Sequence, residues 1–230
     1  MATIIRTTEL RPPKAPNLLI APPLEYQGQY QEQLNNALRL YFNTIDNFCQ
    51  QFIAEEGGAY LKFPYVSASD TAPQYATANN TATIVRWSTL ESGSGFTLNV
   101  NNTATAQVSG VYKITYSLQF ANNNNAAHDS IVWLRVNGST SAADVPDSTT
   151  IFTVPARKSA GVPSFVCGYS EVVFTLNAGD SVGLWWGTDL AATAGGAAGN
   201  YIYYKAAQTT PMAYPVTPSA IGSITFLSAL

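Results

Sequence analysis

The residue types that most often carry chemistry in proteins are scarce in this chain. Its single histidine, His128, stands beside Asp129 in an Asn-rich stretch. A Ser-His-Asp triad needs a buried, oriented histidine, whereas we interpret His128 as a solvated loop residue. The chain has no G-x-S-x-G, H-E-x-x-H or P-loop motif. The sequence does not exclude a pair of carboxylates of the glycosidase type among its fourteen acidic residues. We nevertheless predict no catalytic residues and no enzymatic activity.

Metal and redox chemistry have no better support. The two cysteines, Cys49 and Cys167, lie far apart in the sequence, and we expect two buried free thiols rather than a disulfide. One histidine and two distant cysteines cannot supply the four ligands of a structural zinc site within one chain. The sequence does not exclude an ion bound on the symmetry axis of an oligomer. We therefore expect no metal site and no cofactor.

Aromatic side chains are the remaining candidates for ligand contact. Trp185 and Trp186 are adjacent, and an indole ring can stack on a sugar. Large aromatic side chains more often fill cores and subunit interfaces, so we interpret this pair as buried there and keep sugar binding as the alternative.

The composition describes a weakly charged protein. Only 11% of its 230 residues are charged, and the net charge is −3. A nucleic-acid-binding surface needs clustered basic residues, so no nucleic-acid partner is expected. No apolar run approaches the length of a transmembrane helix, and we expect no membrane insertion. The abundance of Asn, Thr, Ser, Gly and aromatic residues suits an all-β domain that works outside a cell or on a particle.

One stretch has an unmistakable helical period. Six apolar residues recur with steps of three and four, namely Leu34, Leu38, Tyr41, Ile45, Phe48 and Phe52. This spacing places them on one stripe of a long α-helix within residues 25–58, which Gly57 and Gly58 would end. We predict that the stripe is the neck of an oligomer. It spans fewer than three heptads, so a helix packed on its own β-domain is the alternative.

Prolines dominate residues 1–24, which favours an extended arm over a helix. Between the prolines lie three apolar residues, Leu18, Leu19 and Ile20. We interpret them as an anchor that docks on another protein, the alternative being an unstructured terminus. Residues 59–78 are interpreted as a linker.

From residue 79 onward the apolar period becomes two, which indicates β-strands. The clearest strand is Val111–Phe120, where apolar and polar residues alternate. Shorter strands are expected at Thr83–Trp87, Phe96–Val100, Ile131–Val136, Ile151–Val154, Phe165–Tyr169, Val172–Leu176, Val182–Trp186, Tyr201–Tyr204 and Ile221–Leu227. Many short strands predict a sandwich or barrel. Ile131–Val136 and Val182–Trp186 are apolar on both faces, which favours burial against a neighbouring subunit.

Four segments of this region carry a family resemblance. Ser109–Ile114, Leu134–Gly138, Leu176–Leu184 and Ile221–Leu227 resemble, in order and spacing, the C1q/TNF-like jelly roll. The resemblance implies a mainly β, two-sheet sandwich over residues 79–230, here called the head, and a homotrimer with aromatic residues around its threefold axis. The aromatic residues assigned to the head core or interface are Tyr112, Tyr116, Phe120, Trp133, Phe174, Trp185, Tyr201, Tyr203 and Phe226.

A second resemblance covers about thirty residues near the helix. Pro23–Tyr26 and Leu34–Asn43 are similar to a segment near the start of structural proteins of marine tailed bacteriophages. This implies a shared way of joining the virion and favours a phage protein over a host protein. Together with the trimer and the arm, it leads us to predict a virion structural protein, a homotrimeric decoration, spike or short fibre that contacts a capsid or tail protein through residues 1–24. An adhesin for a host receptor or surface glycan is the alternative. Because Met1–Leu10 has no apolar segment of a secretory signal, we expect synthesis in the host cytoplasm and location in the virion.

Overall fold

The computed structural model describes residues 28–53, 63–194 and 198–230. The chain divides into two compact units, residues 1–62 and residues 63–230, each described here by itself. The predicted arm, with its anchor residues Leu18, Leu19 and Ile20, lies outside the described residues, as does the predicted helix stop at Gly57 and Gly58.

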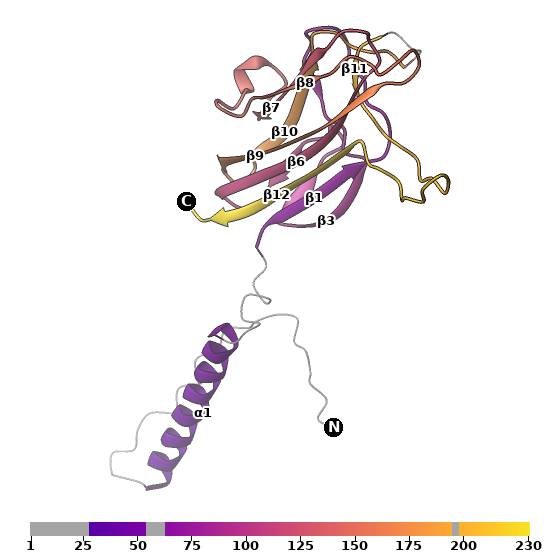
Figure 1. Ribbon diagram of the computed structural model, residues 1–230. Helices are drawn as coiled ribbons and strands as arrows, with labels where there is room; N and C mark the ends of the chain where they lie inside the picture. The colour runs from indigo at the N-terminus through magenta and orange to yellow at the C-terminus, as the bar shows by residue number, and fades with distance from the viewer. Residues whose placement is uncertain (1–27, 54–62, 195–197) are drawn as a thin grey trace. The chain divides into compact units, whose positions relative to one another are not determined.

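The helix of the first unit, α1, spans Gly28–Ile53 (Figure 1). Outside the predicted stripe its surface is mostly polar, although Leu40 and Phe42 are also exposed. Side-chain bonds between residues four apart, such as Gln31 to Asn35, tie successive turns together. Along the stripe the least exposed side chains are Leu34, Tyr41, Ile45 and Phe48, whereas Leu38 is 39% exposed. Phe52 lies in α1, but its side chain is outside the described part of the chain.

The second unit consists of two antiparallel sheets. The first sheet has the order β3-β1-β12-β6-β9, and β11 pairs with β6 beyond the end of β12. Figure 1 shows these strands side by side. Their bounds are β1 Tyr65–Asp70, β3 Thr89–Ser94, β6 Gly110–Asn122, β9 Ser164–Leu176, β11 Asn200–Ile202 and β12 Ala220–Ser228.

The second sheet has the order β4-β5-β10-β7-β8, with β2 also paired to β10. Its bounds are β2 Thr83–Ile84, β4 Phe96–Leu98, β5 Ala104–Ala106, β7 His128–Val136, β8 Thr150–Val154 and β10 Ser181–Thr188. The chain crosses between the sheets after β1, β2, β3, β5, β6, β8, β9 and β10. This strand order makes the unit a jelly-roll sandwich, which confirms the fold class predicted from the sequence.

Alternation along the long strands builds the core between the sheets. In β6, every second residue from Gly110 to Phe120 is buried, and the intervening ones face outward. Tyr112, Tyr116 and Phe120 are at most 1% exposed. Phe120 packs against Trp186 of the opposite sheet, with ring centroids 6.1 Å apart. Phe174 is also buried, and the half-buried Phe226 packs against Tyr112.

The sandwich differs from the sequence prediction at three places. It includes β1, so the predicted linker at residues 59–78 contains a strand that pairs with both β12 and β3. Phe165–Tyr169 and Val172–Leu176 form one strand, β9, because all thirteen of its residues pair in continuous register with β6. The largely polar strand β3 and the short Ala-Thr-Ala strand β5 were not predicted. Among the described residues, no helix has the length and apolar character needed to cross a membrane.

Candidate functional site

The outer face of the first sheet exposes two apolar rows. In β9 the outward residues include Phe165, Tyr169 and Val173, which are 47%, 59% and 57% exposed. In β12 they include Ile221 and Leu227, at 44% and 49%. Strict alternation in β9 puts one residue of each pair in the core and the next in solvent. Strand β9 therefore carries apolar side chains on both of its faces.

A polar lane separates the two rows. The outward residues of β6 are Val111 at its start and then the polar Lys113, Thr115, Ser117 and Gln119, which form the lane. Lys113 lies 3.6 Å from Glu171 of β9, and the Ser117 hydroxyl lies 3.2 Å from the Cys167 sulfur. Cys167 is exposed, as is Cys49 in α1, so the prediction that both thiols are buried is wrong.

Aromatic rings extend the β9 row at one end of the sheet. Phe165 packs on Tyr203, Tyr203 on Tyr201, and Tyr201 on Tyr75, with centroid distances of 4.7, 6.0 and 5.5 Å. Burial, followed by the neighbouring Tyr203 and Tyr75 hydroxyls, raises the pKa of Tyr201. The predicted interface residues Tyr201 and Tyr203 thus join the exposed face of the first sheet.

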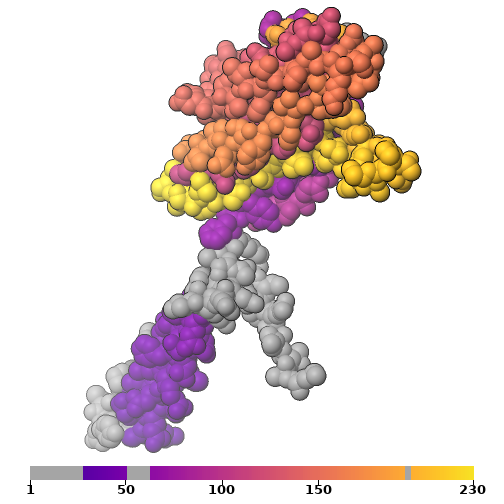
Figure 2. Space-filling model, in the orientation of Figure 1, coloured from indigo at the N-terminus to yellow at the C-terminus, as the bar shows by residue number. Residues whose placement is uncertain are grey.

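Taken together, the rows, the lane and the aromatic cluster form a surface that could receive another protein. In Figure 2 the yellow β12, which carries one of the two rows, lies beside the purple β1. Exposed side chains of this size, spread over adjacent strands, are typical of interaction surfaces. The lane supplies polar groups that could fix the register of a partner.

The two other predicted interface residues lie elsewhere. Trp133 and Trp185 are on the outer face of the second sheet, and both are partly buried. Trp186, next in sequence to Trp185, points into the core and is fully buried. The predicted head residues therefore separate into a core group, a first-sheet group and a second-sheet group. Sequence alternation could have separated Trp185 from Trp186 but could not say which surface Trp185 would share.

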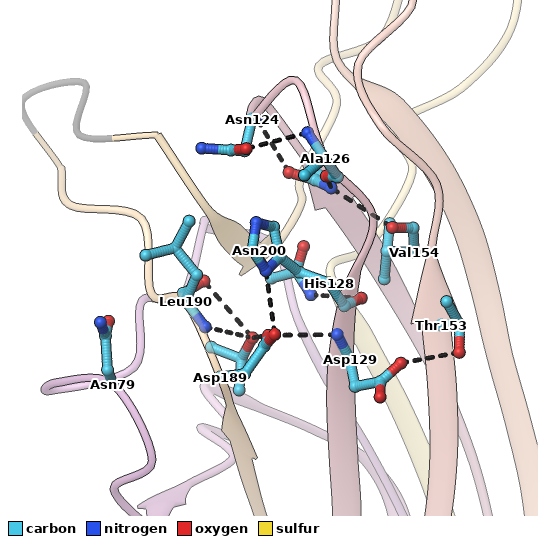
Figure 3. Close-up of polar contacts among 12 residues, drawn as sticks. Asn79, Asn124, Ala126, His128, Asp129, Thr153, Val154, Asp189, Leu190 and Asn200 are labelled. Atoms are coloured by element: carbon cyan, nitrogen blue, oxygen red, sulfur yellow. Dashed lines mark hydrogen bonds and ion pairs between the residues drawn. The ribbon is translucent and has the colours of Figure 1, made fainter.

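His128 is not the solvated loop residue that the sequence suggested. It begins β7, its side chain is 16% exposed, and its Nδ1 lies 2.9 Å from Asp189 Oδ2 at the end of β10 (Figure 3). The other Asp189 oxygen accepts a bond from the Asp129 N–H at 3.1 Å. Burial alone would raise the pKa of Asp189, but the hydrogen bonds and charge of His128, with bonds from Thr188 and Asp129, lower it overall.

This His128–Asp189 pair does not form a triad. In a triad the second imidazole nitrogen bonds a nucleophile's hydroxyl, yet Nε2 of His128 is buried and has no hydrogen-bond partner among the described residues. Asn200 donates to the His128 carbonyl at 3.1 Å and to the Ser130 hydroxyl at 3.0 Å. The cluster ties β7, β10 and β11 together at one end of the sandwich. No group of three or more metal-ligating side chains occurs in residues 28–53, 63–194 and 198–230.

A second ion pair lies where β1 ends. The fully buried Asp70 accepts two bonds from Arg86, at 2.8 and 3.0 Å, and one from the Ala72 N–H at 2.8 Å. Burial would raise the pKa of Asp70, but these bonds, the Arg86 charge and a bond from Ser88 together lower it. Because Asp70 is buried and satisfied on all sides, we assign it a structural role.

Comparison with known proteins adds one structural likeness. No protein-family model matches the chain, and no curated protein matches it. A solved structure titled as that of Eiger TNF from S. frugiperda is similar to it, with a TM-score of 0.46 and 11% sequence identity. The likeness covers 74% of this chain and 96% of that one.

Proposed function

We propose that this chain is a non-enzymatic structural protein of a bacteriophage particle. It assembles as a homotrimer, displays its jelly-roll head, and attaches to a capsid or tail protein through residues 1–24.

Self-association has the most direct support, which is the exposed outer face of the first sheet. Five apolar side chains on β9 and β12 there are between 44% and 59% exposed. Fully burying an exposed side chain of this size contributes about 1.5–3 kcal/mol. Because these side chains are already about half buried, covering each one would contribute about half of that, and a copy of the chain that covered all five would gain a favourable contact. The number three follows from the resemblance of the head motifs to C1q/TNF-like domains.

The helix supports the same conclusion independently. Its least exposed stripe residues, Leu34, Tyr41, Ile45 and Phe48, follow one another at steps of seven, four and three, the spacing by which neighbouring helices pack. Attachment to a particle is supported by the prolines and apolar residues of the arm and by the resemblance of Pro23–Tyr26 and Leu34–Asn43 to phage structural proteins.

The absence of enzymatic activity is supported by the geometry of His128. Its Nδ1 is engaged by Asp189, while its buried Nε2 meets no hydroxyl or thiol in the described part of the chain. A catalytic base must reach the proton that it removes.

Deleting residues 1–24 tests the attachment directly. We expect the truncated chain to remain a folded trimer by light scattering and to be missing from purified particles. Truncated protein present in particles at normal copy number would contradict the assignment of the arm as anchor.

A further inference from the structure

The outer face of the second sheet carries two indole rings side by side. Trp185 of β10 lies directly opposite Trp133 of β7 in the register of the two strands. Glycines occupy the next outward positions of β10 on either side of Trp185. A Cβ at Gly183 would come within 3.2 Å of Trp185 Nε1, and a Cβ at Gly187 within 3.7 Å of the Trp133 ring. The glycines thus make room for indole rings that lie across the strand.

A buried arginine fixes these rings. The guanidinium carbon of Arg135 lies 4.4 Å from the centre of the Trp185 ring and 5.5 Å from that of Trp133. Its Nε donates to Asp144 Oδ1 at 2.6 Å, and the Trp133 indole N–H donates to the same oxygen at 2.8 Å. Because Asp144 neutralises Arg135, the cluster has no unpaired charge. It holds Trp185 from one ring face, while the rest of the side chain is partly exposed and its buried Nε1 has no hydrogen-bond partner among the described residues.

Beside Trp185 lies a groove of about 570 Å³. This volume falls in the range of about 300–1,000 Å³ that is usual for small-molecule sites. Its lining consists of Trp185, Ile84 and Gly138 together with short polar residues from two turns and a strand, namely Asn101, Thr103, Asn137, Ser139 and Ser181.

The polar wall is held in place by its own hydrogen bonds. Ser181 donates to the Thr103 hydroxyl at 2.7 Å, and Thr103 donates to Asn101 Oδ1 at 2.8 Å. Asn137 donates to Asp180 at 2.7 Å and accepts from the Ser181 N–H at 2.8 Å. These bonds use the Asn101 oxygen and leave its exposed amide N–H groups available to a ligand.

We propose that this groove binds a neutral saccharide. A pyranose ring has an apolar face that can lie on an indole, and hydroxyls at its rim that need amide and hydroxyl partners. The groove offers both, Trp185 on one side and Asn101, Ser139 and Ser181 on the other. Its lining has no charged side chain, so neither an anionic sugar nor a phosphate is favoured. The inference does not depend on the oligomeric state or on attachment to a particle.

The test follows the indole N–H signals of the full-length protein by NMR during titration with neutral methyl glycosides of glucose, galactose, mannose and N-acetylglucosamine. The chain has four tryptophans, and Trp185→Phe assigns the signal of Trp185. At least one glycoside is expected to shift that signal. The signal of Trp186, which is fully buried in the core, is the internal control and should not move.

Two variants locate the site. Trp185→Ala should weaken binding of the active glycoside by about tenfold or more, because it removes the stacking surface. Asn101→Ala changes an exposed turn residue and should weaken binding severalfold while the fold is kept. It therefore tests the site even if Trp185→Ala misfolds. Ile151→Ala is the matched control, because Ile151 is 60% exposed on the same sheet and does not line the groove.

If none of the four glycosides shifts the Trp185 signal, the proposal is overturned. Binding that is equally strong in Trp185→Ala and Asn101→Ala also overturns it, because the sugar would then sit elsewhere. Either result leaves the mass of the oligomer unaffected, so failure here is distinct from failure of the proposed function.

Discussion

Tyr169 and Ile221 lie on the two sides of the same β6 residue, because each is the direct cross-strand partner of Ser117. Both side chains are exposed, at 59% and 44%. They are the points where the two apolar rows of the first sheet come closest in register. A partner that covers one of them must also lie near the other, so this pair marks the centre of the proposed interface.

Placing a charge at this centre should separate the subunits. We expect Tyr169→Asp to convert the oligomer to monomer at micromolar concentration, because an unpaired carboxylate would be buried in the contact. Light scattering gives the mass. Ile151→Asp introduces the same charge on the outer face of the second sheet and should leave the mass unchanged. An intact oligomer in Tyr169→Asp would move the interface away from this face.

The helix should contribute to assembly without controlling it. We expect Tyr41→Asp to lower the helical signal in circular dichroism by opening the packed stripe, while the heads keep the oligomer together. Asn43→Asp adds the same charge at an exposed position on the other side of α1 and serves as the control. A wholly monomeric Tyr41→Asp protein would instead show that the helix sets the oligomeric state.

The Asp70–Arg86 pair should make the free energy of unfolding depend on pH in the acid range. The pKa of Asp70 is lowered in the fold, so its ionised form contributes stability above the usual carboxyl value of about 3.9, and this contribution is lost as the pH falls through the lowered pKa. Asp70→Asn should lower the free energy of unfolding by about 2 kcal/mol at pH 7. The difference from wild type should shrink below about pH 4.

Urea unfolding at several pH values measures this effect. Asp147→Asn is a suitable control, because Asp147 is exposed and its positive φ of 61° is one that Asn tolerates. A difference between Asp70→Asn and wild type that stays constant down to pH 2 would show that ionisation of Asp70 does not stabilise the fold.

Truncating an apolar side chain in the core should lower the free energy of unfolding far more than truncating one on the surface. Phe120→Ala should cost about 3–5 kcal/mol of unfolding free energy, because the ring is fully buried against Phe152 and Trp186. Ile151→Ala should change it by no more than about 0.5 kcal/mol, because the side chain is 60% exposed. Equal costs, measured by urea unfolding, would mean that the side chains facing the core between the two sheets are assigned incorrectly.

The sequence predicted the elements whose periodicity is strong. The steps of three and four from Leu34 to Phe52 predicted α1. The alternation from Tyr112 to Phe120 predicted β6 and its buried face. In both cases a single side-chain pattern reports which face is apolar, so no knowledge of distant contacts is needed.

The features that were missed depend on distant partners. Strands β1, β3 and β5 contain mostly small or polar residues, and they are strands because neighbouring backbones pair with them. His128 was placed in solvent because its partner, Asp189, lies 61 positions away in the sequence. The groove beside Trp185 likewise draws residues from turns that no local pattern connects.

The mass of the intact chain in solution tests the central claim most directly. Light scattering coupled to gel filtration at micromolar concentration should give three times the chain mass of 24.6 kDa, because the exposed face of the first sheet and the stripe of α1 both become buried on assembly. A mass of 24.6 kDa under these conditions would contradict the account, since both surfaces would then remain exposed to water.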